Sequence, residues 1–495
     1  MQTEARYESW IDRVDGVVSE VEQVVWEIRG IADQAVDLWM SLESEFPRLS
    51  RLGRAGWVLG QVTSSYRLHG IWAAFLSRED AAQALASLHA RNARRFYELS
   101  VLQGGAFLKV AQALSARPDL LPEVWIDELS RLQDAAPPVG FEEIRRVVET
   151  GLGRPLEELF GRFDEEPVAA ASIGQVHRGL TLGGQPVAVK AQRPGIAELI
   201  AMDMDLLETA LASMRTLLPP TDYQTVTAEV RKMVEGETDY RAEARMMEQL
   251  ADFFDEIPGI VVPRTIPSLC GARVLTSTLI EGRKITVVLD ELATRRDRGD
   301  ADAEQRLSRI LGLVLEAYVR QVLEAGVFQA DPHPGNLLVT DRDEIVLLDF
   351  GCTKTMEPGK REGYLALIRS FLSGDRSGMI DSLEKIGFAT RSGDPETLLT
   401  FTEILLSQFR DAMSTGDRST WLSRSELLAR AGELLETAEG DPVVRLPAEF
   451  VMLSRVFGVL GGLFHHYRPR IDYAQHLAPV LGSAEPPQER SDSRT

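Results

Sequence analysis

One polar motif, built from two aspartates and an asparagine, constrains this chain more than any other feature. Asp331 and Asn336 are five residues apart, and Asp349, which begins an Asp-Phe-Gly sequence, follows 13 residues after Asn336. This is the spacing of a kinase-type phosphoryl-transfer site, where oxygen ligands hold magnesium and a carboxylate orients the attacking hydroxyl or water. We expect Asn336 and Asp349 to be metal ligands and Asp331 to be the orienting acid. The alternative is two surface turns rich in Asp, Pro and Gly.

Two short apolar runs beside the motif predict a β-hairpin. Residues 337–339 and 345–348 are apolar, and the polar turn 341–343 separates them. Both carboxylates would then stand at the edges of the hairpin, where they can converge on one ion.

Composition narrows the class of protein. The 495 residues are enough for two or three domains, and the net charge of −21 argues against a general nucleic-acid binder. Cys270 and Cys352 are too few and too far apart in sequence to suggest a disulfide framework or a cysteine metal site. We find no signal peptide and no apolar run long enough to cross a membrane. These features predict a cytoplasmic protein without a nucleic-acid partner, and they leave open a peripheral contact with a membrane.

The order of segments predicts the fold class. Residues 1–95 have a helical pattern, which continues over 96–160, and residues 161–285 are rich in β-type runs. Residues 286–482 are again helical apart from the hairpin, and residues 483–495 form a polar tail that we expect to be disordered. We therefore predict an α+β, bilobal protein-kinase-like fold with a β-rich N-lobe, a helical C-lobe and an N-terminal helical extension.

A predicted strand carries a candidate cleft lysine. Alternation along residues 186–190 places Val187 and Val189 on one face and Ala188 and Lys190 on the other. The alanine leaves room for a flat base, and the ammonium can reach phosphate oxygens. The alternative is a strand lysine that points to solvent.

A cleft lysine needs a carboxylate partner, and a helix predicted over about 222–254 offers one. An apolar stripe runs along this helix at steps of three and four residues, and the one acid in the stripe is Glu237. An inward carboxylate should be paired because unpaired burial is expensive, so we predict that Glu237 pairs with Lys190. The alternative is that Glu237 lies where the stripe leaves the core.

Three further segments are candidates for nucleotide contact. Small residues ahead of the lysine strand allow backbone amides to approach phosphates, although alanines also simply pack. This loop is Ala169, Ala170, Ala171, Ser172, Gly174 and Gln175. The run 273–279, ending at Leu279, would connect the lobes and present backbone groups to an adenine edge. Lys109 and Gln112 lie three apart on one helix face, which on this basis alone is better explained as a solvated face.

Taken together, these motifs resemble the UbiB/AarF-domain family of atypical protein-kinase-like proteins. The resemblance covers roughly residues 95–370 and rests on residues 109–122, 169–175, 187–190, 237–244, 330–336 and 349–351. It implies that the extension at 96–160 packs over the cleft and places Lys109 and Gln112 inside it. It also implies that Lys190 pairs with Glu237 and contacts phosphate, that Asn336 and Asp349 hold magnesium, and that Asp331 is the catalytic-loop acid. The family's glycine is Ala111 here, which tightens the space near the cleft.

The resemblance implies ATP and Mg²⁺ as cofactors and a role in quinone or other isoprenoid-lipid metabolism. The first hypothesis is therefore an ATPase or small-molecule phosphotransferase with an isoprenoid-lipid or other small substrate, alongside quinone-pathway enzymes. A protein kinase is disfavoured because no Ala-Pro-Glu follows the Asp-Phe-Gly sequence. The second hypothesis is a nucleotide-gated scaffold or lipid-extracting accessory protein. An antibiotic-type phosphotransferase shares the Asp and Asn spacing but leaves the helix of Lys109 unexplained.

Overall fold

The structure is a computed structural model in which the chain forms two compact units. The first unit comprises Met1–Ala136 and Gly195–Glu235, and the second comprises Pro137–Pro194 and Gly236–Thr495. The structure describes residues 47–73, 76–115, 121–132, 137–214, 228, 231–232, 234–391, 398–399, 402, 443–445, 447–472, 476 and 479–480. The expected helical pattern before residue 47 and the expected tail at 483–495 lie outside these residues.

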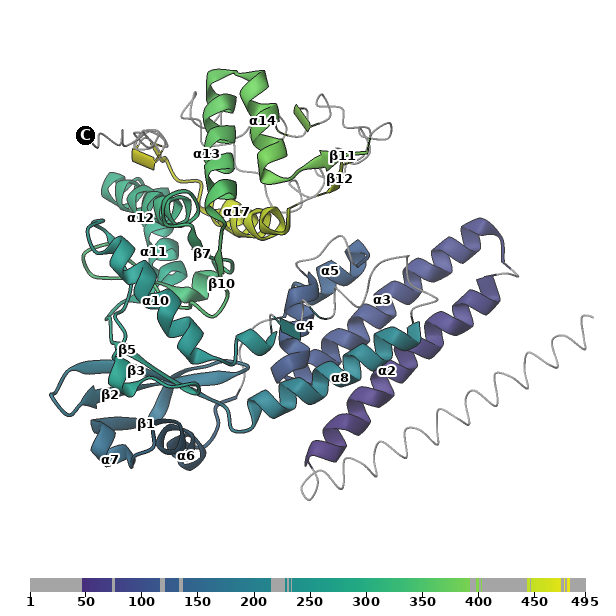
Figure 1. Ribbon diagram of the computed structural model, residues 1–495, viewed down its shortest axis with the longest axis horizontal. Helices are drawn as coiled ribbons and strands as arrows, with labels where there is room; N and C mark the ends of the chain where they lie inside the picture. The colour runs from purple at the N-terminus through teal and green to yellow at the C-terminus, as the bar shows by residue number, and fades with distance from the viewer. Residues whose placement is uncertain are drawn as a thin grey trace, which may run out of the picture. The chain divides into compact units, whose positions relative to one another are not determined.

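The first unit is helical where it is described. Its helices are α2 (Pro47–Trp72), α3 (Arg78–Gln103), α4 (Gly105–Ser115), α5 (Glu123–Leu129) and α8 (Ile196–Met214). Helices α2, α3 and α8 lie side by side (Figure 1). Gly104 separates α3 from α4, which begins at Gly105; both residues have positive φ, a backbone conformation that favours glycine.

Helix α8 belongs to the first unit, although its sequence falls inside the range 161–285 that we expected for the N-lobe. Its buried stripe is Ile196, Ile200, Met204 and Leu207, and the helix packs against α2 and α4. Asp203, which is 1% exposed, accepts two hydrogen bonds from Arg51 of α2, at 3.1 and 2.5 Å. The stripe shows that one face of α8 is buried, but only the structure identifies the surface that covers it.

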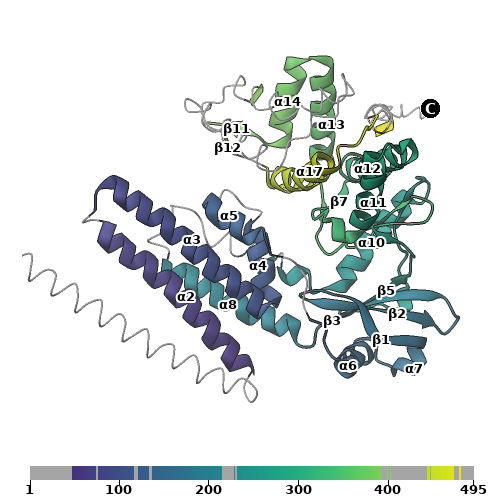
Figure 2. The same cartoon turned by 180° about the vertical axis from the view of Figure 1, so that it is seen from behind.

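The first part of the second unit contains an antiparallel sheet in the order β1-β2-β3-β5. The strands are β1 (Phe160–Ala170), β2 (Gly174–Thr181), β3 (Pro186–Gln192) and β5 (Val274–Thr278). Helices α6 (Phe141–Leu152) and α7 (Leu156–Leu159) pack on one face of this sheet (Figure 2). Val187 and Val189 are fully buried on that face, so Ala188 and Lys190 point to the opposite face, as the strand alternation predicts.

The rest of the second unit is mainly helical and encloses one large apolar core. Its helices are α10 (Tyr240–Phe254), α11 (Ile285–Asp297), α12 (Ala301–Arg320), α13 (Pro358–Ser373), α14 (Arg376–Ile386) and α17 (Ala448–Tyr467). Its short helical turns are η2 (Pro267–Leu269), η3 (Gln321–Ala325) and η4 (Pro334–Asn336). No helix in the described part of the chain is long and apolar enough to cross a bilayer.

Short strands lie among these helices, and those around residues 327–355 position the polar motif. The short strands are β4 (Ile260–Val261), β6 (Arg283–Lys284), β7 (Val327–Gln329), β8 (Leu337–Val339), β9 (Ile345–Leu347), β10 (Thr353–Thr355), β11 (Ala389–Thr390) and β12 (Val443–Arg445). The predicted hairpin is confirmed, because β8 and β9 pair antiparallel. Asp343 in its turn has a φ of 58°, and Arg306 holds the Asp343 carboxylate through two bonds of 2.8 and 2.7 Å.

Candidate phosphate and magnesium site

Lys190 lies at the centre of the candidate site, on the face of β3 opposite to α6. Its Nζ donates to Oε1 of Glu243 over 2.7 Å and lies 3.6 Å from Oδ1 of Asp349. The side chain of Glu243 is 4% exposed, that of Lys190 is 21% exposed, and that of Asp349 is 43% exposed. One ammonium therefore connects a buried carboxylate on α10 to a carboxylate at the accessible side of the site.

The predicted pairing of Lys190 with Glu237 is wrong, because the buried partner is Glu243. The predicted continuous helix is interrupted at residues 237–239, where Glu237 occupies a turn and is only partly buried. Asp239 then caps α10, since its side chain accepts a hydrogen bond from the amide of Arg241. The new helix has its own phase, in which Glu243 is on the buried face with Tyr240 and Met247.

Charge and burial both act on the Lys190 pair. Burial alone would lower the pKa of Lys190, but the carboxylates of Asp349 and Glu243 outweigh it and hold that pKa well above its usual value. Burial raises the pKa of Glu243, and the nearby ammonium opposes that rise. Lys190 therefore stays cationic at neutral pH, as a phosphate-binding lysine must.

Backbone hydrogen bonds bring the Asp331–Asn336 loop and the Asp-Phe-Gly segment together. The amide of Ala330 donates to the carbonyl of Cys352 over 2.7 Å, and the amide of Leu348 donates to the carbonyl of Asn336 over 3.1 Å. The amide of Gly351 donates to Asp349 Oδ1 over 2.9 Å, which fixes the direction of that carboxylate. Asp331, Asn336 and Asp349 are each partly exposed, so the loop presents polar oxygens to solvent.

This donor set fits magnesium held together with phosphate. Within the described residues, no group of three or more His, Cys, Asp or Glu side chains is arranged to hold a metal ion. Magnesium, however, usually takes one or two protein carboxylates and fills its other positions with phosphate oxygens and water. Asn336 and Asp349 offer an amide oxygen and a carboxylate, which suits that mode of binding.

The alanine-rich segment forms a tight turn between β1 and β2. Ala171 donates its amide to the carbonyl of Gly174 over 2.8 Å. Arg193 holds the turn from outside, since its side chain donates to the carbonyls of Ala171 at 2.9 Å and Pro137 at 2.6 Å. Ala169 is exposed, and Ala170 is partly exposed.

Gln175 and Ser172 of this segment are turned inward. Gln175 is 1% exposed, and its side chain exchanges two hydrogen bonds with the backbone of Val139, at 2.8 and 3.2 Å. Ser172 is 2% exposed. The side chain of Gln175 therefore braces the sheet, and any contact of this residue with nucleotide would involve its backbone.

The remaining predicted contacts have mixed outcomes. Ala188 is on the same face of β3 as Lys190 and is partly exposed. The amide of Leu279 donates to Pro186 O over 3.1 Å, so its backbone contact with a base would use the carbonyl oxygen. Lys109 and Gln112 lie on α4 of the first unit, both partly buried, and their placement in the cleft stays a prediction.

Besides Glu243, three further residues of the site were missed by sequence reasoning. Tyr240 has its ring centroid 5.1 Å from Lys190 Nζ, and Gln329 donates from its side chain to the carbonyl of Asp349. Gln192, 2% exposed, donates to the carbonyls of Thr238 and Ala272 and so ties β3 to the start of α10. In the sequence each is only a polar residue close to a motif, and that does not distinguish a site residue from a surface residue.

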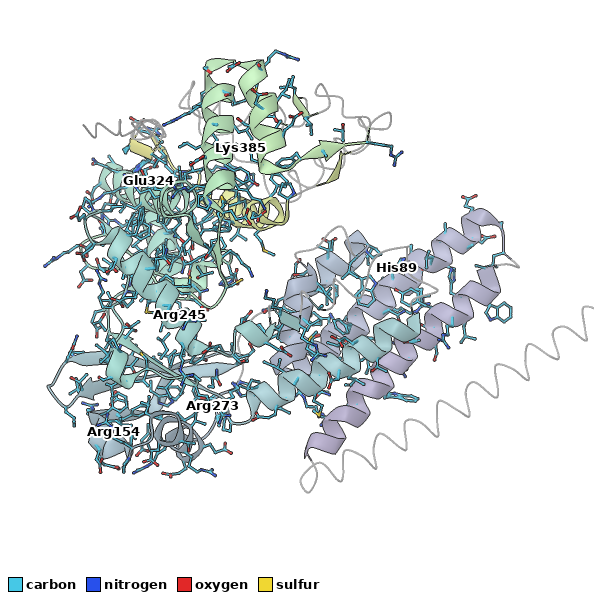
Figure 3. The ribbon with its side chains drawn as sticks, in the orientation of Figure 1. His89, Arg154, Arg245, Arg273, Glu324 and Lys385 are labelled. Atoms are coloured by element: carbon cyan, nitrogen blue, oxygen red, sulfur yellow. The ribbon has the colours of Figure 1, made fainter. Side chains whose placement is uncertain are left out.

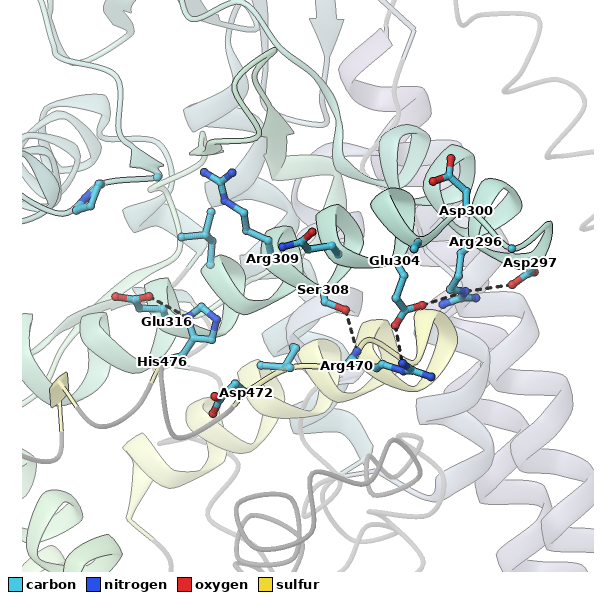
Figure 4. A pocket seen from close by; sticks show the side chains of 17 residues that line it. Arg296, Asp297, Asp300, Glu304, Ser308, Arg309, Glu316, Arg470, Asp472 and His476 are labelled. Carbon is cyan, nitrogen blue, oxygen red and sulfur yellow. Dashed lines mark hydrogen bonds and ion pairs between the residues drawn. The ribbon is translucent and has the colours of Figure 1, made fainter.

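An open pocket of about 1080 Å³ lies elsewhere in the second unit, between α12, residues 470–472 and His476 (Figure 4). The amide of Arg470 donates to Ser308 Oγ over 2.9 Å, and His476 Nδ1 lies 3.1 Å from Glu316 Oε2. None of the predicted phosphate or magnesium residues lines this pocket.

Comparisons with known proteins agree with this geometry. The model of the ABC1 atypical kinase-like domain matches residues 131–383. The chain is 31% identical to "Protein ACTIVITY OF BC1 COMPLEX KINASE 8, chloroplastic" of Arabidopsis thaliana, over 76% of this chain and 52% of the relative. It is 30% identical to "AarF domain-containing protein kinase 1" of Mus musculus, over 68% of this chain and 64% of the relative. The chain thus spans about half the length of its plant relative.

A solved structure supports the fold. The complex of Rv3197 with erythromycin from Mycobacterium tuberculosis aligns with a TM-score of 0.56 at 24% identity, over 83% of this chain and 100% of that chain. At this level of identity the likeness concerns the fold alone. The predicted α+β kinase-like fold and the predicted family are both confirmed.

Proposed function

Because this chain belongs to the ABC1 atypical kinase-like family, we propose that it binds Mg·ATP and uses it as an ATPase or small-molecule phosphotransferase. The observation that carries the proposal is the position of Lys190 between the buried Glu243 and the accessible Asp349. This arrangement is the lysine–glutamate pair and Asp-Phe-Gly aspartate that kinase-type phosphoryl transfer requires.

Each group then has a role set by its chemistry. Lys190 contacts phosphate oxygens, Glu243 holds the lysine, and Asp331 orients the hydroxyl or water that attacks. Asn336 and Asp349 would hold magnesium, which when bound neutralises charge on the phosphates.

The acceptor is proposed to be a small molecule, with an isoprenoid lipid of quinone metabolism as the first candidate. The segment after Asp349 supports a non-peptide acceptor, because β10 ends at Thr355 and α13 begins at Pro358. Two residues cannot form the extended activation segment on which protein kinases dock their peptide substrates. A peripheral membrane contact and quinone-pathway partners belong to the same proposal.

Calorimetric titration with Mg·ATP tests the nucleotide site. Lys190→Ala and Asp349→Asn should each weaken binding at least about tenfold, which corresponds to about 1.4 kcal/mol. Lys385→Ala is the matched control, since Lys385 lies on α14, 3.1 Å from Glu362 at the surface (Figure 3). Unchanged affinity in the first two variants would remove the site assignment.

Turnover measurements distinguish the enzyme from an accessory protein that only binds nucleotide. Phosphate release should be measured with and without detergent and an isoprenoid phenol. If Asp349→Asn abolishes turnover but keeps in-cell function, the protein acts as a nucleotide-gated scaffold and the enzyme proposal is lost.

A further inference from the structure

Tyr240 carries a buried hydroxyl without a hydrogen-bonding partner among the described residues. The residue is 0% exposed and is the first residue of α10, after the capping Asp239. Its backbone is paired, since its amide donates to the carbonyl of Ala272 over 3.1 Å. The unpaired group is thus the phenol alone.

The hydroxyl lies against the turn of residues 171–174 between β1 and β2, on the side of Lys190. A Cβ added to Gly174 would overlap the Tyr240 hydroxyl and would lie 2.7 Å from the carbonyl oxygen of Ala191. In the β2–β3 register, Gly174 pairs with Gln192 and Val176 pairs with Lys190, so Gly174 and Lys190 share one face of the sheet. The hydroxyl is therefore on the face where Lys190 meets phosphate.

An unpaired buried hydroxyl costs stability, and native structures rarely keep one. Neighbouring polar groups are satisfied, since Gln175 bonds Val139 and Gln192 bonds Thr238. A phenylalanine would place the same ring beneath the Lys190 ammonium without this cost. Burial also raises the pKa of Tyr240, so the phenol stays protonated and able to donate.

We propose that the Tyr240 hydroxyl is a phosphate-binding donor that acquires its partner only in the nucleotide-bound state, when the turn of residues 171–174 moves away from it. The inference rests on the proposed function and adds a residue to that site. One feature favours such a movement: the underside of the turn is a glycine that leaves no side chain between the hydroxyl and the backbone. The movement would break the hydrogen bonds from Arg193 to Ala171 and Ile173 and the one from Ala171 to Gly174.

Substitution Tyr240→Phe tests this idea, because the ring and its contact with Lys190 stay while the hydroxyl is removed. The full chain should be as stable as the original or more stable without nucleotide, yet it should bind Mg·ATP about 5- to 20-fold more weakly. Adenosine, which lacks phosphate, should bind both proteins equally.

Tyr364→Phe is the matched control. The Tyr364 hydroxyl on α13 is also buried and has no hydrogen-bonding partner among the described residues. It should show the same stability change without a change in affinity for Mg·ATP.

Equal Mg·ATP affinity of Tyr240→Phe and the original chain would overturn the inference. So would an equal loss for ATP and adenosine, because the hydroxyl would then serve the fold. If the original chain does not bind Mg·ATP at all, the proposed function itself fails, which is a separate outcome.

Discussion

Replacing Glu243 by Gln is the sharpest test of the site, because it separates the partner seen in the structure from the partner that the sequence suggested. The substitution keeps the size and shape of the side chain and removes only its charge. Glu237→Gln makes the same chemical change six residues earlier, in the turn before α10. The two variants therefore make the same chemical change, one at the buried partner of Lys190 and one at a partly buried turn residue.

The expected magnitude follows from the geometry. Two unit charges 2.7 Å apart attract by about 6 kcal/mol at an effective dielectric constant of about 20, before desolvation is subtracted. Removing one partner of a buried pair typically costs about 3–5 kcal/mol, because the other charge stays buried. Asp349 remains 3.6 Å from Nζ, but its side chain is 43% exposed and its attraction is screened. We expect a loss of about 3 kcal/mol in unfolding free energy for Glu243→Gln, the lower end of that range.

Nucleotide affinity should fall with stability. Without Glu243, the ammonium is drawn toward Asp349, which places two groups meant for phosphate and magnesium in contact with each other. A tenfold or greater loss of Mg·ATP affinity corresponds to about 1.4 kcal/mol or more. Denaturant unfolding and calorimetry measure the two effects, and a double-substitution cycle with Lys190→Met should give a coupling of about 1–3 kcal/mol. A larger loss in Glu237→Gln than in Glu243→Gln would refute the reasoning.

Three other expectations test different parts of the site and its surroundings. Asp331→Asn should leave Mg·ATP affinity within about twofold and reduce phosphate release by about 100-fold or more, as expected for loss of an orienting acid. Gly174→Ala should cost about 1–3 kcal/mol in denaturant unfolding, because the added methyl meets the Tyr240 hydroxyl and the Ala191 backbone. Gly60→Ala, inside α2 with no neighbour within 4 Å, should instead stabilise the fold by up to about 1 kcal/mol. Burial works to raise the pKa of Glu316, but hydrogen bonds from His476 and Arg320 outweigh it and lower that pKa. Its stabilisation is therefore present above the unfolded pKa of about 4.3 and is lost as pH falls through the lower folded value, so stability should decline with acid less steeply in Glu316→Gln.

Features with a short sequence period were predictable. The alternation of Val187, Ala188, Val189 and Lys190 and the apolar runs of the β8–β9 hairpin follow from the two-residue repeat of a strand, which depends on neighbours in sequence alone. The position of Asp331, Asn336 and Asp349 beside this hairpin was predictable as well, because all three are close to it in sequence. One hairpin and its flanking loops carry all three residues.

The choice of Glu237 failed because a helical stripe has meaning only within one unbroken helix. Asp239 caps a new helix, so the stripe before it does not continue into α10. From Tyr240, a step of three residues reaches Glu243 and a step of four reaches Ala244, and either step fits a helical stripe. An N-cap aspartate followed four residues later by an acid was the available signal. The grouping of α8 with α2 had no such signal, since amphipathicity identifies a buried face but not the surface that covers it.

The turn at residues 237–239, which the sequence analysis did not predict, also helps to hold the Lys190–Glu243 pair in place. The side chain of Gln192 holds the carbonyls of Thr238 and Ala272, and the amide of Tyr240 donates to Ala272 as well. The start of α10 is thus hydrogen-bonded to the end of β3, the strand that carries Lys190, and to Ala272, just before β5. An outward swing of α10 would break these bonds and the ion pair together, and it would expose Tyr240, which is fully buried. The pair is therefore held in place by backbone hydrogen bonds of its surroundings as well as by charge.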